Sequence, residues 1–445
     1  MLKTILITIA CSALLVFGIF GFIYFSTTSS KNSENVILET TTEINTKSNT
    51  DNKISTPTPP KISITASSSH QITACQNITT SGTYVVNRDL DDETEGCLTI
   101  ENTKDIIIDC NNHTVFGAPA VKFTNVQNFS LKSCQLKKLT ALGGQLYSLQ
   151  IEKSSYGDIS QDDFGINSYV ELYDSNNIQF YENKINAYVQ SFYGTYNIFE
   201  KNTFVLPNPK GIISGSIVLQ YGSHNIIRNN NIDGGAKGIF ENQDGVDDGV
   251  VIMDEHDDIV DSNSIKNVWD CGIETTGIIS NTVFNNNSTT NSGLCGIGAW
   301  YFSSWLNNTV SNNIFENTQQ PFLFFRSYGF RPAGFDNKKL FPADTVSYFK
   351  DNTFSKNIFK NPRSTSYSPY YIDIGVPPAL SGGVTGETMP QKSAFITGNN
   401  IFSGNDFGLV PPLSFSPKNI VVDGGGNVCR SSPVGYEINC EADPD

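Results

Sequence analysis

The residues best suited to chemistry are acidic side chains and one histidine that gather between Glu241 and Asp258. The candidates for acid/base catalysis are Asp244, Asp247, Asp248 and His256. Paired carboxyl groups carry out glycoside hydrolysis, and a histidine beside them can exchange a proton near neutral pH. The alternative is that these residues only form turns, because aspartate and a solvated histidine suit turn backbone.

The second half of the same stretch is a candidate calcium site. Its ligands would be Asp254, Glu255, Asp257 and Asp258. Calcium binds several carboxylate oxygens, and crowded carboxyl groups have raised pKa values unless a cation neutralises them. Aligning Ile265 with Ile232 places 254–258 on the corner that 221–225 occupy in the preceding repeat. We therefore expect a turn and not a helix face, and no cofactor besides calcium is indicated.

Aromatic and arginine side chains that could hold a sugar follow the acidic stretch. The candidates for substrate binding are Trp300, Trp305, Arg326, Tyr328 and Arg331. Aromatic rings provide stacking surfaces, and arginine binds carboxylates through two parallel hydrogen bonds. Two long insertions interrupt the repeats, at about residues 318–345 and 362–392, and insertions in a solenoid often lie on the binding face. The alternative is that these aromatic residues only pack the insertions onto the body of the protein.

The elements that must position these candidates are short repeated strands. A turn, then Asn, Asp or Ser, then an apolar pair returns along the chain at intervals of 20 to 46 residues. The anchors of this repeat are Asp105, Asn128, Ser148, Asn177, Asn197, Asn225, Asp258, Asn281, Asn308, Ser347, Ser393 and Asn419. The apolar runs are too short for helices, so the sequence predicts an all-β solenoid, a single-stranded parallel β-helix of about twelve rungs. Asparagine suits the corners because it tolerates left-handed backbone, and in register it can form side-chain ladders.

A resemblance to a known superfamily agrees with this fold. Cys75 to Gly117, with Cys97-Leu98-Thr99-Ile100 and Ile107 to Val115, resembles the first rungs of right-handed parallel β-helix proteins of the pectate-lyase-like superfamily. The resemblance spans roughly residues 63–430 and implies a right-handed coil. Because that superfamily includes lyases, hydrolases, epimerases and adhesins, it does not decide the reaction.

A shorter resemblance concerns the acidic residues themselves. Asn242-Gln243-Asp244-Gly245 with Asp247-Asp248 looks like the paired acids of polygalacturonase-type hydrolases. The Gly-His-Gly and Arg-x-Lys elements that follow in those enzymes are absent from this sequence, so hydrolase roles are not carried over.

The spacing of the cysteines predicts disulfides between rungs. Of the nine cysteines, Cys11 lies in an apolar N-terminal segment, which leaves eight. Equivalent positions on neighbouring rungs are about 4.8 Å apart, a separation that a disulfide accepts. The predicted pairs are Cys110–Cys134 and Cys271–Cys295 between rungs, and Cys75–Cys97 and Cys429–Cys440 within the two ends. These pairs indicate an oxidising compartment, and the alternative is buried free thiols.

The N-terminal part predicts a membrane anchor. Residues 1–25 contain a long apolar run that ends in Phe-Ile-Tyr-Phe, which favours an uncleaved signal anchor over a cleaved signal peptide. Residues 26–62 are rich in Ser, Thr and Pro and predict a disordered stalk, so 63–445 form the β-helix domain with its caps. The formal net charge of −15 argues against nucleic acid as a partner.

Together these features predict a single-pass membrane protein whose β-helix lies outside the cytoplasm. The expected partner is a polysaccharide or cell-surface glycan, which the protein binds and, if it is an enzyme, cleaves by hydrolysis or elimination, or epimerises. The alternative is a non-catalytic adhesion or scaffold module whose elongated wall is the functional surface.

Overall fold

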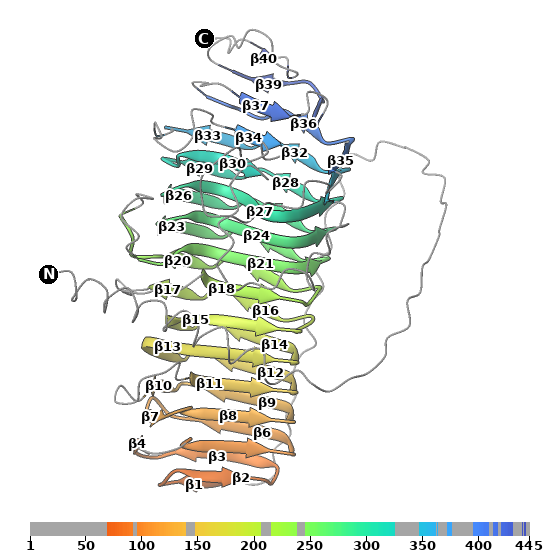
Figure 1. Cartoon of the computed structure of the whole chain (residues 1–445). Helices are drawn as coiled ribbons and strands as arrows, with labels where there is room; N and C mark the ends of the chain where they lie inside the picture. The colour runs from red at the N-terminus through yellow and green to blue at the C-terminus, as the bar shows by residue number, and fades with distance from the viewer. Residues whose placement is uncertain are drawn as a thin grey trace, which may run out of the picture. The chain divides into compact units, whose positions relative to one another are not determined.

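The computed structural model describes most of the chain beyond residue 68. The described residues are 69–91, 96–138, 147–205, 215–237, 245–324, 347–361, 363, 372–375, 395–408, 413–416, 420–429, 438 and 440–441. Within them the regular structure is entirely β, and the strands stack as successive turns of one coil (Figure 1). The predicted signal anchor and stalk lie outside these residues. No helix in the described part of the chain is long and apolar enough to span a membrane.

One side of the coil is a parallel sheet with one strand from each turn. Its fourteen strands are β1 (Ser69–Ile72), β3 (Gly82–Val86), β6 (Lys104–Asp109), β9 (Gln127–Lys132), β12 (Ser155–Ser160), β14 (Asn176–Tyr181), β16 (Ile198–Glu200), β19 (Ile226–Arg228), β22 (Ile259–Asp261), β25 (Val283–Asn285), β28 (Thr309–Ser311), β32 (Thr353–Ser355), β36 (Ile401–Ser403) and β38 (Val422–Asp423). We call this side the first sheet.

The other two sides belong to one 24-stranded parallel sheet, because β13 and β15 each run through both sides. The second row contains β4 (Leu90–Asp91), β7 (Thr114–Gly117), β10 (Gln135–Lys138), β13 (Asp163–Tyr173), β15 (Lys184–Phe192), β17 (Thr203–Val205), β20 (Asn231–Asp233), β23 (Ser264–Val268), β26 (Ser288–Ser292), β29 (Ile314–Glu316) and β33 (Ile358–Lys360). The third row contains β2 (Gln76–Ile78), β5 (Leu98–Glu101), β8 (Val121–Thr124), β11 (Tyr147–Glu152), the ends of β13 and β15, β18 (Gly215–Gln220), β21 (Asp248–His256), β24 (Cys271–Ser280), β27 (Cys295–Leu306), β30 (Gln320–Phe324), β31 (Ser347–Lys350), β34 (Ile372–Gly375), β35 (Phe395–Gly398) and β37 (Leu413–Ser416). A separate pair, β39 (Asn427–Val428) and β40 (Cys440–Glu441), follows.

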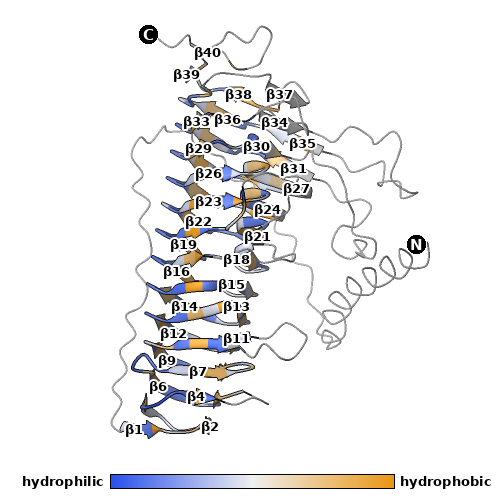
Figure 2. Ribbon diagram, turned by 90° about the vertical axis from the view of Figure 1, so that its left-hand side faces the viewer, coloured by the Kyte–Doolittle hydropathy of each residue, from blue (hydrophilic) through white to orange (hydrophobic). Residues whose placement is uncertain are grey.

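The core is a column of apolar side chains that point inward from all three sides. In β14, for example, Ile178 and Phe180 are fully buried while their neighbours are partly exposed. The same alternation gives the strands their banded colouring in Figure 2. Near the C-terminal end the column is built from phenylalanine rings, and Phe354 stacks on Phe402 with ring centroids 4.5 Å apart. Each turn therefore buries its apolar side mainly against the next turn.

The corners are held by ladders of polar side chains, as predicted. In each ladder the backbone N–H of one residue donates to the side-chain oxygen of its equivalent on the next turn. The second ladder, between the first sheet and the second row, runs without a break through Asp162, Asn183, Asn202, Asn230, Asn263, Asn287, Asn313, Asn357, Asn405 and Asn427. The first ladder, between the third row and the first sheet, includes Asn197, Asn225, Asp258, Asn308, Asn352 and Asn400. These bonds satisfy backbone groups where the chain turns and no strand partner is present.

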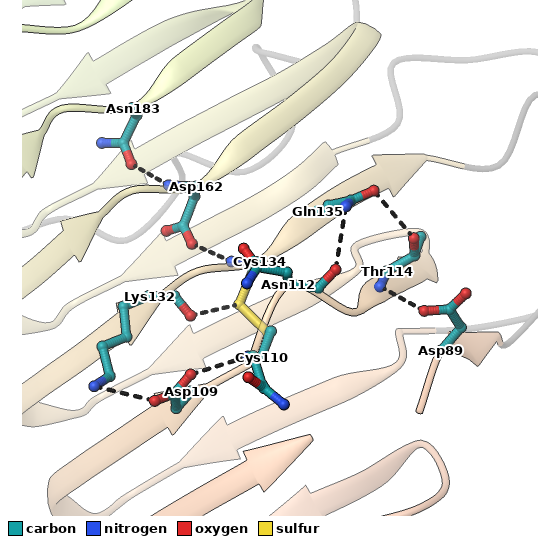
Figure 3. Close-up of a disulfide and its surroundings, with 11 residues drawn as sticks. Asp89, Asp109, Cys110, Asn112, Thr114, Lys132, Cys134, Gln135, Asp162 and Asn183 are labelled. Carbon is teal, nitrogen blue, oxygen red and sulfur yellow. Dashed lines mark hydrogen bonds and ion pairs between the residues drawn. A yellow bond between two sulfur atoms is a disulfide. The ribbon is translucent and has the colours of Figure 1, made fainter. Parts of the chain in front are cut away.

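Figure 3 shows how the second ladder begins. The N–H of Cys134 donates to Asp162 at 2.7 Å, and the N–H of Asp162 donates to Asn183 at 2.9 Å. Burial raises the pKa of Asp162 well above its usual value, and this carboxyl group occupies the ladder position that asparagine holds on later turns.

The predicted disulfides are confirmed where both sulfurs are described. Cys75–Cys97, Cys110–Cys134 and Cys271–Cys295 are bonded, with Cα separations of 4.4 to 4.8 Å. Cys429 is also disulfide-bonded, but the side chain of Cys440 lies outside the described set, so the Cys429–Cys440 pair stays a prediction.

The number and register of the turns differ in part from the prediction. The first sheet has fourteen strands, not about twelve, because β1 and β3 lie in a segment that was expected to be a cap. The anchors Ser148 and Ser347 belong to the third row and not to the first sheet, and the anchor Ser393 lies outside the described residues. The correct steps near the C-terminal end are 44 residues from Thr309 to Thr353 and 48 from Thr353 to Ile401.

Both long insertions interrupt the third row at the same place. The chain leaves this row after Phe324 on one turn and after Gly375 on the next, and Phe324 pairs with Ile374. It returns at Ser347 and Phe395, which also pair. The two insertions therefore start and end on one face, as expected for a solenoid.

Candidate functional site

Four carboxyl groups from two adjacent turns meet at the start of the third row. Asp247 and Asp248 lie at the start of β21, and Asp270 and Glu274 lie at the start of β24. The register brings them together: the N–H of Asp270 donates to the carbonyl of Asp247 at 2.9 Å, and Glu274 pairs with Val251. We call these four residues the acid cluster.

The acid cluster is packed tightly. Asp248 is almost completely buried, and its Oδ1 accepts a 2.9 Å hydrogen bond from the N–H of Cys271. The nearest ligand atoms of Asp248, Asp270 and Glu274 all lie within 4.8 Å of one another. Cys271 Sγ lies in the same group, but it is bonded to Cys295 and is not a free thiolate. Asp247 Oδ1 is buried and has no hydrogen-bond partner among the described residues.

Burial and mutual repulsion change the acidity of the acid cluster. Burial raises the pKa of Asp247 to about 7 and, with the nearby charge of Asp247, raises the pKa of Glu274 to about 8. Burial also raises the pKa of Asp248 and of Asp270 well above the usual value, and the charge of Glu274 adds to both shifts. None of these shifts is offset by a described lysine or arginine. At neutral pH the acid cluster therefore holds protons that it can donate.

This arrangement has two chemical uses. A protonated carboxyl group beside an ionised one is the pair needed for general acid/base catalysis near neutral pH. Once deprotonated, the oxygens of Asp248, Asp270 and Glu274 form a hard ligand set that suits Ca²⁺, Mg²⁺ or Mn²⁺. Protons and a cation would compete for the same oxygens, so the two uses exclude each other at a given moment.

The structure does not bring the predicted calcium ligands together. Glu255 and Asp258 are buried at the corner of the first ladder, where Glu255 accepts hydrogen bonds from Gly222 N and Asn225 Nδ2, at 2.7 and 3.1 Å. Asp258 Oδ1 accepts from Asn225 N at 2.7 Å. Burial raises the pKa of Glu255 to about 9 and that of Asp258 to about 7, which indicates a proton shared within the pair. This pair serves the corner, because three of its four oxygens accept hydrogen bonds from Gly222 and Asn225.

The other two predicted ligands face elsewhere. Asp254 accepts a hydrogen bond from Ile278 N at 2.8 Å and packs against Gly277. Gly277 has a φ of +72°, and a side chain at this position would collide with the carboxylate of Asp254. Asp257 lies beside His256, with Asp257 Oδ2 2.6 Å from His256 Nδ1.

His256 is not part of the acid cluster. Strand β21 runs from Asp248 to His256, so the two residues are about 26 Å apart at the usual rise of a strand. The predicted catalytic set is therefore divided: Asp247 and Asp248 belong to the acid cluster, His256 lies at the far end of the strand, and Asp244 lies outside the described residues. Asp270 and Glu274, which complete the cluster, were not among the predicted catalytic residues.

The prediction for Trp305 is wrong. This side chain is completely buried, its Nε1 donates to Thr275 Oγ1 at 2.9 Å, and its ring stacks on Phe284. It packs the core and cannot contact a sugar. Of the other predicted substrate-binding residues, Trp300 pairs with Thr276 in the third row, but its side chain is not described. Arg326, Tyr328 and Arg331 lie outside the described residues.

The sequence reasoning missed a group of exposed and partly exposed tyrosines at the corner between the third row and the first sheet. Tyr173, Tyr193 and Tyr221 lie on successive turns, with centroids 5.7 Å and 5.4 Å apart. Tyr156 and Tyr196 are exposed at the same corner, by 39% and 48%. The signal in the sequence was a tyrosine at each repeat step, at 173, 193 and 221.

Several of these tyrosines adopt the left-handed backbone conformation, with positive φ, that asparagine adopts at the equivalent position of other turns. Tyr156 has a φ of +58°, and its equivalent on the next turn is Asn177, with a φ of +57°. Tyr193 and Tyr196 also have φ near +57°. A bulky residue in left-handed backbone costs about 1–2 kcal/mol, so these rings are held exposed at the expense of stability. We call Tyr156, Tyr173, Tyr193, Tyr196 and Tyr221 the tyrosine stripe.

Comparisons with known proteins agree with the fold. Residues 170–338 match the family model described as the right handed beta helix region. No curated protein has a significantly similar sequence.

Solved structures with a similar course of the chain act on or bind different molecules. A mannuronic acid specific polysaccharide family 6 lyase from human gut microbiota is 14% identical, with 84% of this chain and 83% of the lyase covered and a TM-score of 0.47. An endo-xylogalacturonan hydrolase from Aspergillus tubingensis is 13% identical, covering 82% and 91%, with a TM-score of 0.40. The surface adhesin PfbA of Streptococcus pneumoniae is 11% identical, covering 79% and 81%, with a TM-score of 0.38.

The family match and the parallel strands stacked on three sides lead to one conclusion about the kind of protein. The described residues form a parallel β-helix, and residues 170–338 match the right-handed family model, as the repeats and the resemblance to the pectate-lyase-like superfamily predict.

Proposed function

We propose that this protein is a membrane-anchored, cell-surface β-helix protein that binds a polysaccharide and hydrolyses it at the acid cluster. The observation that carries the proposal is the meeting of Asp247, Asp248, Asp270 and Glu274 on two adjacent turns, where burial raises the pKa of all four carboxyl groups. Hydrolysis of a glycosidic bond needs carboxyl groups that exchange protons and a water molecule, and the acid cluster supplies such carboxyl groups.

The proposed reaction assigns one proton donor and one base. A protonated carboxyl group, Glu274 or Asp247, donates its proton to the oxygen of the leaving sugar as the glycosidic bond breaks. A neighbouring ionised carboxylate removes a proton from the water that adds to the anomeric carbon, so the proton balance is restored at the end of the cycle. Asp244, which precedes the acid cluster by three residues, remains a candidate for the same chemistry.

The position of the acid cluster and the sign of the protein's charge narrow the substrate. The side chain of Glu274 is only partly buried, which supports access to the acid cluster from outside the third row. Both insertions leave the third row on later turns of the same row. The net charge of −15 favours a neutral glycan, or an acidic one bridged by cations.

The N-terminal segment and the disulfides support the proposed location. Residues 1–25 would hold the protein in the membrane and 26–62 would separate the β-helix from its surface. Three disulfides between neighbouring turns suit an extracytoplasmic compartment.

The test is product analysis on the purified full-length protein. Neutral and acidic polysaccharides are incubated with wild type, Asp270→Asn and Glu274→Gln, and mass spectrometry follows chain shortening and the mass of the new ends. We expect products that have gained one water, and a loss of about 10²-fold or more in each variant. Asp261→Asn is the matched control, because Asp261 is a partly exposed acid on β22 outside the acid cluster. Unsaturated products, or full activity in both variants, would refute the proposal.

The tyrosine stripe favours a second candidate function, adhesion without catalysis. Exposed rings in costly left-handed backbone indicate a surface kept for contact with a ligand. If the protein is an adhesin, it retains glycans in a pull-down without shortening them. Tyr193→Ala then weakens retention, whereas Glu274→Gln leaves it unchanged.

A further inference from the structure

Two of the four histidines of the chain meet an aspartate at one corner. His224 lies before β19, and His256 ends β21 on the next turn. The N–H of His224 donates to the carbonyl of His256 at 3.0 Å, which fixes the two backbones side by side. Asp257 follows His256 directly. One nitrogen from each ring and one Asp257 oxygen lie within 4.8 Å of one another.

The three side chains are directed at one point. Asp257 Oδ2 lies 2.6 Å from His256 Nδ1 and 4.0 Å from His224 Nε2. His224 Nδ1 lies 3.0 Å from Ser223 Oγ, a hydrogen bond that leaves Nε2 as the nitrogen facing Asp257. One face of the His224 ring stacks on the ring of Tyr196, with the ring centroids 4.7 Å apart. The ring is therefore oriented from two directions before any ligand binds.

We propose that His224, His256 and Asp257 bind one divalent transition-metal ion of the zinc class. Two imidazole nitrogens and one carboxylate oxygen form the mixed donor set that Zn²⁺ prefers, whereas Ca²⁺ and Mg²⁺ require mainly oxygen. Donors around a tetrahedral Zn²⁺ are about 3.3 Å apart, which follows from bonds of about 2.0–2.1 Å. The distances of 2.6 and 4.0 Å lie on either side of that value, and small rotations of these partly exposed side chains make them equal.

The site has the form of an open metal centre. Three protein ligands leave a fourth position for water or an external ligand, and the exposure of all three side chains allows access to it. Ser223 takes the role of the outer partner that fixes the ring of a metal-binding histidine. The site is independent of the acid cluster, because Asp248 and His256 occupy opposite ends of β21.

The test counts metal ions on the full-length protein after removal of metal with EDTA. Equilibrium dialysis against Zn²⁺, followed by elemental analysis, gives the affinity and stoichiometry, and Co²⁺ absorption in the visible range reports nitrogen ligands. We expect one tightly bound Zn²⁺, affinity weaker by about 10-fold or more in His224→Gln and in His256→Gln, and loss of that ion in the double variant.

His113→Gln is the matched control. His113 Nδ1 also lies near a carboxylate, Asp89 Oδ1 at 3.3 Å, but no second histidine is part of that pair. We expect its removal to leave Zn²⁺ binding unchanged. Equal binding by wild type and the double variant would overturn the proposal, and so would a wild-type Co²⁺ spectrum typical of oxygen ligands alone. The Co²⁺ spectrum needs no variant, so the proposal stays testable if a substitution disturbs folding.

Discussion

Replacing Asn287 with alanine is expected to destabilise the second ladder at its centre. Asn287 is buried between β25 and β26, and its side chain takes part in four hydrogen bonds. Its Oδ1 accepts from the backbone and side-chain nitrogens of Asn263, at 3.1 and 3.0 Å. Its Nδ2 donates to Val260 O at 2.8 Å and to Asn313 Oδ1 at 3.1 Å.

The expected loss follows from these four bonds. A buried hydrogen bond contributes about 1 kcal/mol to stability, and a partner left unpaired in the interior adds to the cost. Asn287→Ala removes all four bonds and leaves the N–H of Asn263 without its acceptor, so the free energy of unfolding should fall by about 4 kcal/mol. The backbone at this position is unchanged, because the N–H of Asn287 still donates to Asn313.

Urea denaturation with the disulfides intact measures this loss. Asn186→Ala is the control, since Asn186 is only partly buried in β15 and, among the described residues, its side chain makes one hydrogen bond of 3.4 Å. We expect the control to change the free energy of unfolding by about 0.5 kcal/mol or less. A loss of less than about 1 kcal/mol for Asn287→Ala, with an unchanged denaturant slope, would refute the reasoning that the ladder holds the turns together.

Three further predictions concern the acids and the disulfide. Burial raises the pKa of Glu274 to about 8, so the folded protein binds more protons than the unfolded chain, and its stability should fall as pH rises from about 4 to about 8. Glu274→Gln should reduce that fall. If the urea midpoints of wild type and variant fall equally over this pH range, the prediction is wrong. Asp258→Asn should stabilise the protein at pH 8. Burial raises the pKa of Asp258 to about 7, so the carboxyl group is charged at this pH, whereas asparagine accepts the same hydrogen bond from Asn225 N without a buried charge. A lower thermal midpoint of the variant at that pH would show that the acid itself is required. Replacing Cys271 and Cys295 together by alanine should lower the free energy of unfolding by about 3 kcal/mol, as expected for a disulfide that closes a loop of 24 residues. Equal urea midpoints for reduced and oxidised wild type would contradict this prediction.

The sequence allowed the fold and the disulfides to be predicted because position in a solenoid is position along a repeat. Cys110 and Cys134 are 24 residues apart, which is one turn, and their Cα atoms are 4.8 Å apart. The register failed at Ser347, because the insertion before it adds residues that belong to no repeat. Trp305 was misjudged for a related reason, because the direction of a side chain depends on where the bulge in β24 and β27 falls.

The candidate site was predicted only in part. Asp247 and Asp248 attracted attention as consecutive acids, and the search for partners then followed the chain to His256. The partners lie instead one turn away, where Asp270 is 23 residues beyond Asp247 and bonded to its backbone. The repeat step that predicted the cysteine pairs also applied to the acids, whereas the burial that raises the pKa of Glu274 depends on packing and is not visible in sequence.

The hydrogen bonds of the second ladder keep the same length whatever the number of residues in the turn that they join. The turn that carries Asn287 to Asn313 uses 26 residues, and those that join Asn313 to Asn357 and Asn357 to Asn405 use 44 and 48. The ladder bond at each step is nevertheless 2.9 to 3.1 Å long. Evolution can therefore lengthen, shorten or exchange a loop on the third row without moving the rungs above it. The same property makes those loops natural places at which to graft a new recognition sequence onto this scaffold.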